Sequence, residues 1–182
     1  MSRNRVSSHV IIVNFCTQLG VEYKSMVKLI RPLLKHYFMG RSEEENIKAL
    51  VTIDARKEAV RRKFIKMAKN PDDYTETDKT VFAVAVACCS WYPEKSAKLL
   101  TKMEDMVPDG KELVYILNCV YLEGDGRTDL SMQNELHMSS GTYNRRKDDA
   151  TALYGALILE YAIRREKEEV AAGKVPPPDF EL

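Results

Sequence analysis

Residues 120–150 read VYLEGDGRTDLSMQNELHMSSGTYNRRKDDA, and this stretch gives the strongest indication of the fold. Gly124 and Gly126 predict the end of a preceding helix, because glycine adopts the left-handed cap conformation at little steric cost. Thr128 is expected to cap a short helix over residues 129–136, since its hydroxyl oxygen can accept a hydrogen bond from an amide of the first turn. The stretch therefore predicts a break followed by a short helix.

The short helix is expected to bury either Leu130 or Met132 together with Leu136. His137 and Met138 follow as a turn, with Met138 as the apolar contact between this helix and the next. The pattern favours two helices that pack against each other through a small apolar cluster.

A second helix is predicted to begin after Ser139, with Tyr143 and Ala150 on its buried side. In helix-turn-helix proteins the first turns of such a helix face base edges in the major groove, and nearby basic side chains hold phosphates. Asparagine can pair with adenine and arginine with guanine, each worth about 1–3 kcal/mol of base discrimination. The candidate DNA-binding residues are Thr128, Ser139, Ser140, Gly141, Thr142, Asn144, Arg145, Arg146 and Lys147.

An ordinary helical hairpin with a solvated polar face is the alternative interpretation of this stretch. Gln133 stands where helix-turn-helix proteins commonly have a small residue, and His137 replaces their usual turn glycine. On spacing alone, DNA binding and a purely structural hairpin both remain open.

Two related protein families resemble this region. Residues 111–150 are similar to region four of bacterial sigma factors, where a helix ending in a YLEG-type sequence, here residues 121–124, precedes a short helix and a recognition helix. Residues 136–150 more closely resemble the phage late-gene regulators of the RinA/ArpU type. The residues that carry this likeness are Ser139, Thr142, Tyr143, Arg145, Arg146, Lys147 and Ala150. The resemblance does not reach residues 1–75, and it implies sequence-specific promoter binding, with a contact to RNA polymerase left open.

The composition is typical of a soluble globular protein. The chain has 182 residues, 30% of them charged, and no apolar run approaches the roughly 20 residues that a membrane-spanning helix needs. The cysteines form no CxxC pair, so we expect buried reduced thiols and a cytoplasmic protein. The histidines are scattered, and neither a metal nor another cofactor is expected.

Signatures of catalysis are missing from the sequence. It contains no GxGxxG, GxxxxGK[ST], HExxH or GxSxG pattern. Adjacent carboxylates such as Asp148 and Asp149 diverge on a helix rather than converge. We therefore do not expect an enzyme.

The net charge of +1 conceals an asymmetry between the two halves. Residues 1–69 hold 15 Lys and Arg against 6 Asp and Glu, a net charge of +9, and residues 70–182 hold 13 against 21, a net charge of −8. A basic half is a candidate footprint for polyanions. Packing of the halves against each other, or their alternation in an oligomer, explains the asymmetry equally well.

Apolar periodicity predicts helices for most of the remaining chain. A break or kink is expected at Arg31, because Pro32 follows it. Residues 10–15 have the composition of a strand, but one strand cannot form a sheet, so we favour a helix capped by Ser7 or Ser8. The predicted helices cover residues 10–15, 21–38, 42–68, 81–91, 93–106 and 108–121, and the helix after Ser139 is expected to reach about Arg165.

Three of these helices carry further expectations. Residues 81–91 are apolar on all sides and are predicted to be the central helix, capped by Thr77 or Asp78. For the basic run at residues 61–63 we favour a solvated stripe. The long helix after Ser139 is expected to dock on the core rather than to form a dimer seam.

The predicted fold class is all-α, a helical bundle with a C-terminal helix-turn-helix similar to sigma region four. Residues 1–70 are expected to form a basic N-terminal helical region and residues 74–168 a helical domain with the helix-turn-helix. Residues 169–182 are expected to form a Pro-rich tail that is extended or disordered.

The favoured function is a phage-type or prophage-type transcription regulator that binds double-stranded DNA through the helix after Ser139. One alternative is a phage packaging component of the small-terminase type, which also binds DNA but acts as a ring. Another is a helical protein-interaction module that contacts RNA polymerase. For the favoured function a homodimer is left open, and no membrane partner is expected.

Overall fold

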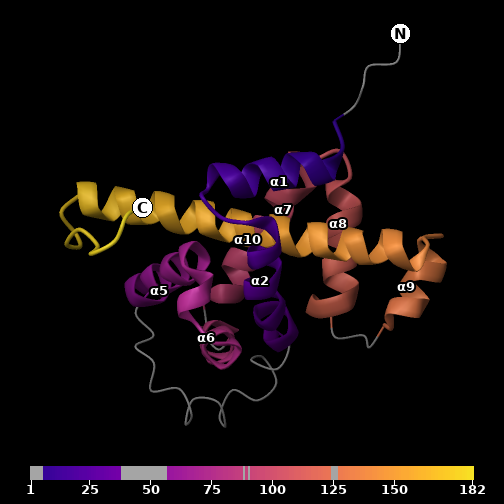
Figure 1. Cartoon of the computed structure of the whole chain (residues 1–182), viewed down its shortest axis with the longest axis horizontal. Coiled ribbons are helices and arrows are strands. Elements are labelled where there is room, and N and C mark those ends of the chain that lie inside the picture. Colours follow the sequence, from indigo (N-terminus) through magenta and orange to yellow (C-terminus); the bar gives the residue numbers. More distant parts are fainter. Residues whose placement is uncertain (1–5, 38–56, 88, 90, 124–126) are drawn as a thin grey trace.

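The computed structural model describes residues 6–37, 57–87, 89, 91–123 and 127–182 (Figure 1). All regular secondary structure within these ranges is helical, which confirms the predicted all-α class. The helices are α1 (Ser8–Gln18), α2 (Tyr23–Tyr37), α5 (Lys57–Lys69), α6 (Glu76–Ala87), α7 (Tyr92–Met106), α8 (Gly110–Leu117), α9 (Asp129–Glu135) and α10 (Ser140–Ala171), with a 3₁₀ turn η1 (Pro71–Asp73) and a π-helical turn η2 (Asn118–Leu122). The expected helix start at Ser42 and the expected break at Gly124 and Gly126 lie outside the described residues.

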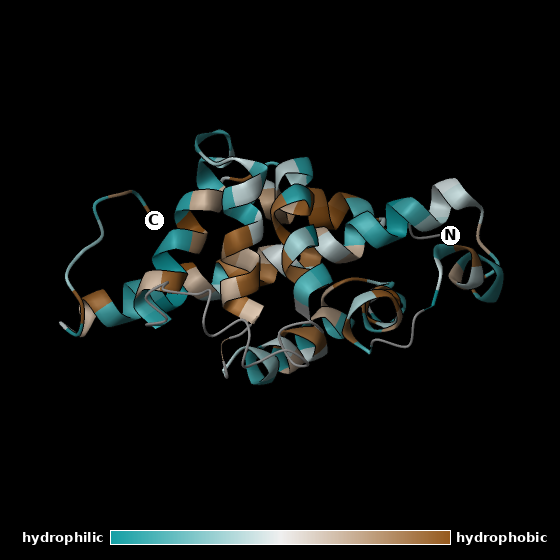
Figure 2. Cartoon of the chain, turned by 90° about the horizontal axis from the view of Figure 1, so that it is seen from below, coloured by the Kyte–Doolittle hydropathy of each residue, from teal (hydrophilic) through white to brown (hydrophobic). Residues whose placement is uncertain are grey.

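Helix α10 is the central element of the molecule. Every residue from 149 to 157 is buried, and the helix packs against α1, α2, α5, α7, α8 and α9. Its 32 residues make it about 48 Å long, so it runs along the whole molecule (Figure 1). Hydrophobic residues gather where the helices meet, and hydrophilic residues face outward (Figure 2). Docking of this helix on the core is confirmed, although it extends beyond its expected end at Arg165.

Single residues explain several helix boundaries. Ser7 accepts a hydrogen bond from the amide of Val10 and caps α1, so the strand-like run at the N-terminal side is a helix. Helix α2 continues through Pro32, and the alternative of a break at Arg31 is wrong. Pro93 occupies the first turn of α7, as predicted, because the amide that proline lacks has no partner there in any helix.

Helix α6 begins earlier than predicted, because Thr75 rather than Thr77 or Asp78 is its cap. The Thr75 hydroxyl accepts a hydrogen bond from the Asp78 amide at 3.1 Å, and the Asp78 carboxylate accepts one from the Thr75 amide at 2.8 Å. This reciprocal pair is a capping box with aspartate in the place of the usual glutamate. Val81 is 49% exposed, so α6 has a solvent face and is not the central helix.

The basic run of α5 packs against acidic residues of α10. Arg61 donates to Glu166 and to Glu169, each at 2.6 Å, and Arg62 donates to Glu166 at 2.7 Å. The Glu166 side chain is fully buried, and that of Arg61 is 8% exposed. Although burial favours the neutral form, the two carboxylates raise the pKa of Arg61 above its ordinary value. The expected solvated stripe at residues 61–63 is therefore wrong for both arginines.

The C-terminal tail folds back on α5. Lys66 forms an ion pair with Asp179 at 2.9 Å, and its ammonium group lies 5.0 Å from the centre of the Phe180 ring. Arg62 donates to the carbonyl oxygen of Pro176. The tail contains no helix or strand beyond α10, and these contacts hold it against α5.

A single hydrophobic cluster contains buried residues that precede η1 in the sequence and buried residues that follow it. Helix α2 reaches this cluster by passing very close to α10 at Gly155. A Cβ atom on Gly155 would lie 2.4 Å from Ile30 Cγ1 and 2.6 Å from Met26 Sδ. The lack of a side chain at Gly155 thus sets the approach of α2 to α10. None of the described helices is long and apolar enough to cross a bilayer.

Candidate nucleic-acid interface

Helices α9 and α10 are joined by the short turn at residues 136–139. Thr128 caps α9 by accepting a hydrogen bond from the Ser131 amide at 3.1 Å, and Ser139 caps α10 by accepting one from the Thr142 amide at 3.3 Å. Both caps are as predicted. His137 has a φ of 53°, the left-handed conformation that glycine takes most easily, so a non-glycine residue holds the turn.

A small apolar cluster holds the two helices together. Met132 and Tyr143 are fully buried in it, and Leu136 and Met138 pack against them. Met132 is therefore the buried residue of the pair proposed from the sequence, whereas Leu130 is 66% exposed. The remaining buried members of the cluster come from α8 and η2, namely Ile116 and Cys119.

The first turns of α10 face solvent. Ser139, Ser140, Gly141, Asn144 and Arg145 are exposed, and Thr142 is half-buried. We refer to residues 140–145 as the α10 tip. Within the described residues, the guanidinium group of Arg145 has no hydrogen-bond or ion-pair partner, and a Cβ on Gly141 would meet nothing within 4 Å. The tip therefore presents small polar groups and one unpaired cation.

The next two basic residues are bound within the chain. Arg146 forms ion pairs with Asp109 at 2.6 Å and Glu112 at 3.2 Å. Lys147 pairs with Asp129 at 2.7 Å and lies over the Tyr143 ring, 5.4 Å from its centre. These contacts tie α10 to the start of α8 and to the start of α9, and they fix the direction in which the tip points.

Asp129 is the centre of the second tie. Burial opposes its charged form, but the hydrogen bond and charge of Lys147 together with a hydrogen bond from Tyr143 lower the pKa of Asp129. The Tyr143 hydroxyl donates to Asp129 at 3.1 Å. Burial and the Asp129 charge in turn raise the pKa of Tyr143, which keeps its proton and remains the donor.

A polar network that the sequence did not indicate lies where α1 and α2 meet α10. The Asp149 carboxylate is buried and accepts hydrogen bonds from His9 Nδ1 at 2.6 Å and from the Tyr23 hydroxyl at 2.8 Å. Asp148 points elsewhere and pairs with Arg31 at 2.6 Å. The two adjacent carboxylates therefore diverge, as predicted: Asp149 connects α10 to α1 and to the start of α2, and Asp148 connects it to Arg31.

The sequence alone did not identify the acids that pair with Arg146, nor the residues that hydrogen-bond to Asp149. All of these partners are remote from α10 in the sequence. Asp109 also accepts a hydrogen bond from the Ser8 hydroxyl at 2.7 Å, which joins α1 to the same group. Spacing along a helix reveals neighbours three or four residues apart, and it carries no signal for such pairs.

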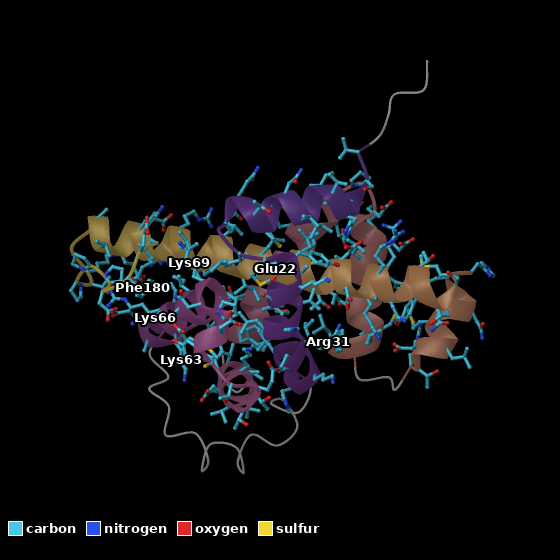
Figure 3. The ribbon with its side chains drawn as sticks, viewed as in Figure 1. Glu22, Arg31, Lys63, Lys66, Lys69 and Phe180 are labelled. Atoms are coloured by element: carbon cyan, nitrogen blue, oxygen red, sulfur yellow. The ribbon has the colours of Figure 1, made fainter. Side chains whose placement is uncertain are left out.

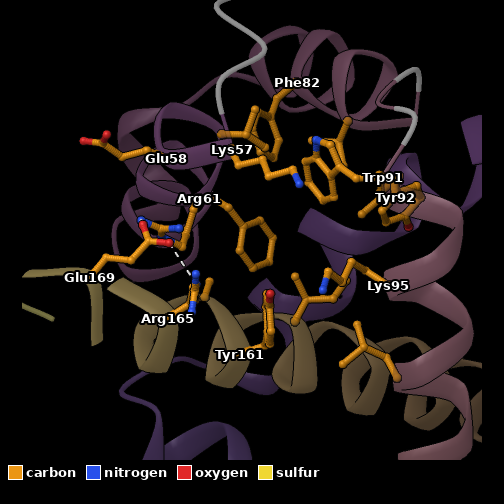
Figure 4. Close-up of a pocket in the computed structure, with 17 residues that line it drawn as sticks. Lys57, Glu58, Arg61, Phe82, Trp91, Tyr92, Lys95, Tyr161, Arg165 and Glu169 are labelled. Atoms are coloured by element: carbon orange, nitrogen blue, oxygen red, sulfur yellow. Dashed lines mark hydrogen bonds and ion pairs between the residues drawn. The ribbon is translucent and has the colours of Figure 1, made fainter. Parts of the chain in front are cut away.

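A separate cavity of about 420 Å³ lies between α5, α6, α7 and α10 (Figure 4). Its walls are mostly apolar and aromatic, with Phe82, Trp91 and Tyr161 among them. Of its charged residues, Arg165 pairs with Glu169 at 2.8 Å. The lining includes no residue of the α10 tip, so the cavity is not part of the candidate interface.

Within the described ranges, no group of three or more His, Cys, Asp or Glu side chains is placed to hold a metal ion. No family model, no curated protein and no solved structure matches the chain. The likeness to sigma region four and to RinA/ArpU-type regulators therefore rests on the sequence residues named for it.

Proposed function

We propose that the protein is a sequence-specific DNA-binding regulator of transcription, of the phage or prophage type, that contacts base edges with the α10 tip. The observation that carries this proposal is the exposure of Ser140, Asn144 and Arg145 on a rigidly held helix start. Asparagine and arginine are the side chains that pair bidentately with adenine and guanine. Small neighbours such as Gly141 allow the helix to approach the floor of the groove.

The helix end also has the correct electrostatic sign for DNA. The first amides of a helix and its dipole give the N-terminus a partial positive charge that favours phosphate. Arg145 adds a full charge that no described acid neutralises. Acids around the tip, namely Asp148, Asp129 and Asp109, already pair with Arg31, Lys147 and Arg146, which lowers their repulsion of a duplex.

Ordering of the tip before binding is a further argument for the proposal. Tyr143 is buried, Ser139 caps the helix, and two ion pairs tie the next turn to α8 and α9. A helix that is already fixed loses little conformational entropy on binding, so more of the contact energy appears as affinity.

We expect the double substitution Asn144→Ala and Arg145→Ala to weaken binding to the preferred duplex by at least about tenfold, because each bidentate base contact is worth about 1–3 kcal/mol. Binding to unrelated DNA should change much less. Fluorescence anisotropy with a labelled duplex measures both affinities.

The matched control is Arg164→Ala with Lys167→Ala, two exposed residues at the other end of the same helix. It should leave both affinities near those of the unsubstituted protein. Unchanged affinity of the Asn144/Arg145 variant for the preferred duplex, with unchanged thermal unfolding, would contradict base contacts by the α10 tip.

The exposed Leu130 favours a second candidate function, a protein-interaction module that contacts RNA polymerase through α9. A large apolar side chain that is 66% exposed beside the tip is a suitable anchor for a protein partner. Retained DNA affinity in the Asn144/Arg145 variant, combined with loss of polymerase binding on Leu130→Ser, would favour this candidate over the first.

A further inference from the structure

Among the described residues, folding pairs three cations of α5 with acids but leaves the lysines of α2 without such partners. Arg61, Arg62 and Lys66 of α5 pair with acids of α10 and the tail. Helix α2 contains no acidic residue, and three of its lysines are exposed. The ammonium groups of Lys24, Lys28 and Lys35 have no ion-pair partner in the part of the chain that the structure describes.

These lysines lie with Arg31 along a single face of α2. Their positions, 24, 28, 31 and 35, follow the spacing of four, three and four residues that places side chains in a row on a helix. The row is about 16 Å long. The opposite face carries Met26, Ile30 and Leu34, which are buried. We refer to Lys24, Lys28, Arg31 and Lys35 as the α2 stripe.

A hollow beside the stripe is lined mainly by basic residues. A cavity of about 360 Å³ between α2 and α6 is lined by Lys28, Arg31, Lys35 and His36 on one side and by Glu76 and Thr80 on the other. Glu76, its single acid, pairs with Lys79 at 2.9 Å. The Nδ1 atom of His36 is buried and has no hydrogen-bond partner among the described residues. The hollow is therefore suited to an anionic oxygen.

The stripe is adjacent to the α10 tip. Arg31, which Figure 3 labels on α2, pairs with Asp148 of α10 at 2.6 Å. Asp148 lies about 6 Å along the axis from Asn144 and about 4.5 Å from Arg145, which is about one helical turn. Residues four and three apart share a helix face, so Arg31 connects the stripe to the side of α10 that carries the proposed base contacts.

We propose that the α2 stripe binds the phosphates of the same duplex whose bases the α10 tip contacts. This inference rests on the proposed function for the identity of the ligand as duplex DNA. A stripe of about 16 Å covers several phosphates, which follow one another about every 3.4 Å of helix axis on each strand. Glutamine is polar but uncharged, so its introduction removes the charge attraction to phosphate while it keeps a polar side chain at the surface.

The test compares the full-length protein with a variant carrying Lys24→Gln, Lys28→Gln and Lys35→Gln. Each phosphate contact contributes about −0.9 to the slope of log affinity against log salt concentration. We expect the slope to become shallower by about 2 to 3, and binding at low salt to weaken by at least about tenfold for preferred and unrelated duplexes alike. The ratio between those two affinities should stay the same.

The matched control carries Lys69→Gln, Lys167→Gln and Lys174→Gln, which removes the same charge from α5, from α10 and from the C-terminal tail. It should keep the slope of the unsubstituted protein. The inference would be overturned if the stripe variant had the same unfolding temperature and the same salt-dependence slope as the unsubstituted protein. It would also be overturned if the slope changed equally in the stripe variant and in the control.

Failure of the proposed function gives a different result. If the unsubstituted protein binds all duplexes equally and the Asn144/Arg145 variant behaves identically, base contact by the tip fails, while a shallower slope in the stripe variant still supports phosphate binding by α2. If the unsubstituted protein binds no duplex even at low salt, both proposals fail.

Discussion

Replacement of Glu166 by alanine should lower the free energy of unfolding by about 3–5 kcal/mol, because it breaks two ion pairs at once and leaves the buried Arg61 charge only partly compensated. Glu166 is fully buried and accepts hydrogen bonds from both Arg61 and Arg62. In the variant, Arg61 keeps only Glu169 at the edge of the site. Urea unfolding followed by circular dichroism at 222 nm measures the loss.

Glu168→Ala is the matched control for this experiment. Glu168 lies on the same helix, its side chain is 53% exposed, and it pairs with Arg164 and Arg165 at the surface. Exposed ion pairs contribute about 0–1 kcal/mol, so this variant should unfold almost like the unsubstituted protein. Similar losses in the two variants would show that the Arg61–Glu166 contact is not a buried tie between α5 and α10.

Gly155→Ala should also destabilise the protein, with a net loss of about 1–2 kcal/mol. The added methyl group would lie 2.4 Å from Ile30 and 2.6 Å from Met26, both of which are buried and cannot move aside freely. Overpacking of this kind costs about 1–3 kcal/mol, and the better helix propensity of alanine returns up to about 1 kcal/mol. The same urea unfolding experiment measures the net effect.

The same substitution at Gly141 should have the opposite sign. Gly141 lies on the same helix, but a methyl group there meets nothing within 4 Å. Gly141→Ala should therefore stabilise the protein by up to about 1 kcal/mol through helix propensity alone. If both substitutions stabilised the protein, the close crossing of α2 over α10 at Gly155 would be contradicted.

Local signals in the sequence predicted the caps and the buried side of the α9–α10 helix pair. Thr128 and Ser139 cap their helices, and Tyr143 is buried as its spacing indicated. A cap depends on a side chain and an amide three residues away, so the sequence contains both partners together. The choice between Leu130 and Met132 could not be made, since it depends on which face of α9 meets α8.

Interactions between distant residues escaped sequence reasoning. Arg61 is separated from Glu166 by 105 positions, and the run at residues 61–63 has the appearance of a solvated basic face. The charge asymmetry did contain a signal, because a basic half and an acidic half can neutralise each other. It could not say which charges pair, and therefore could not separate α5, whose arginines are bound, from α2, whose lysines are exposed.

The central helix was misplaced for a related reason. Residues 81–91 are the more continuous apolar run, yet α10 is the buried helix, and it contains Asp149 and Thr151 within its most buried stretch. Asp149 is tolerated there because His9 and Tyr23 hydrogen-bond to it. A hydropathy pattern assigns an aspartate to the surface. It cannot show that partners from α1 and α2 will hydrogen-bond to Asp149 in the core.

The central claim is that the α10 tip contacts DNA bases in a sequence-dependent way. Selection of bound duplexes from a random library by the full-length protein, followed by sequencing, tests it most directly. The account predicts enrichment of a defined motif whose preference at individual positions is lost in the Asn144→Ala and Arg145→Ala variant. Absence of any enriched motif, or the same motif from both proteins, would contradict it.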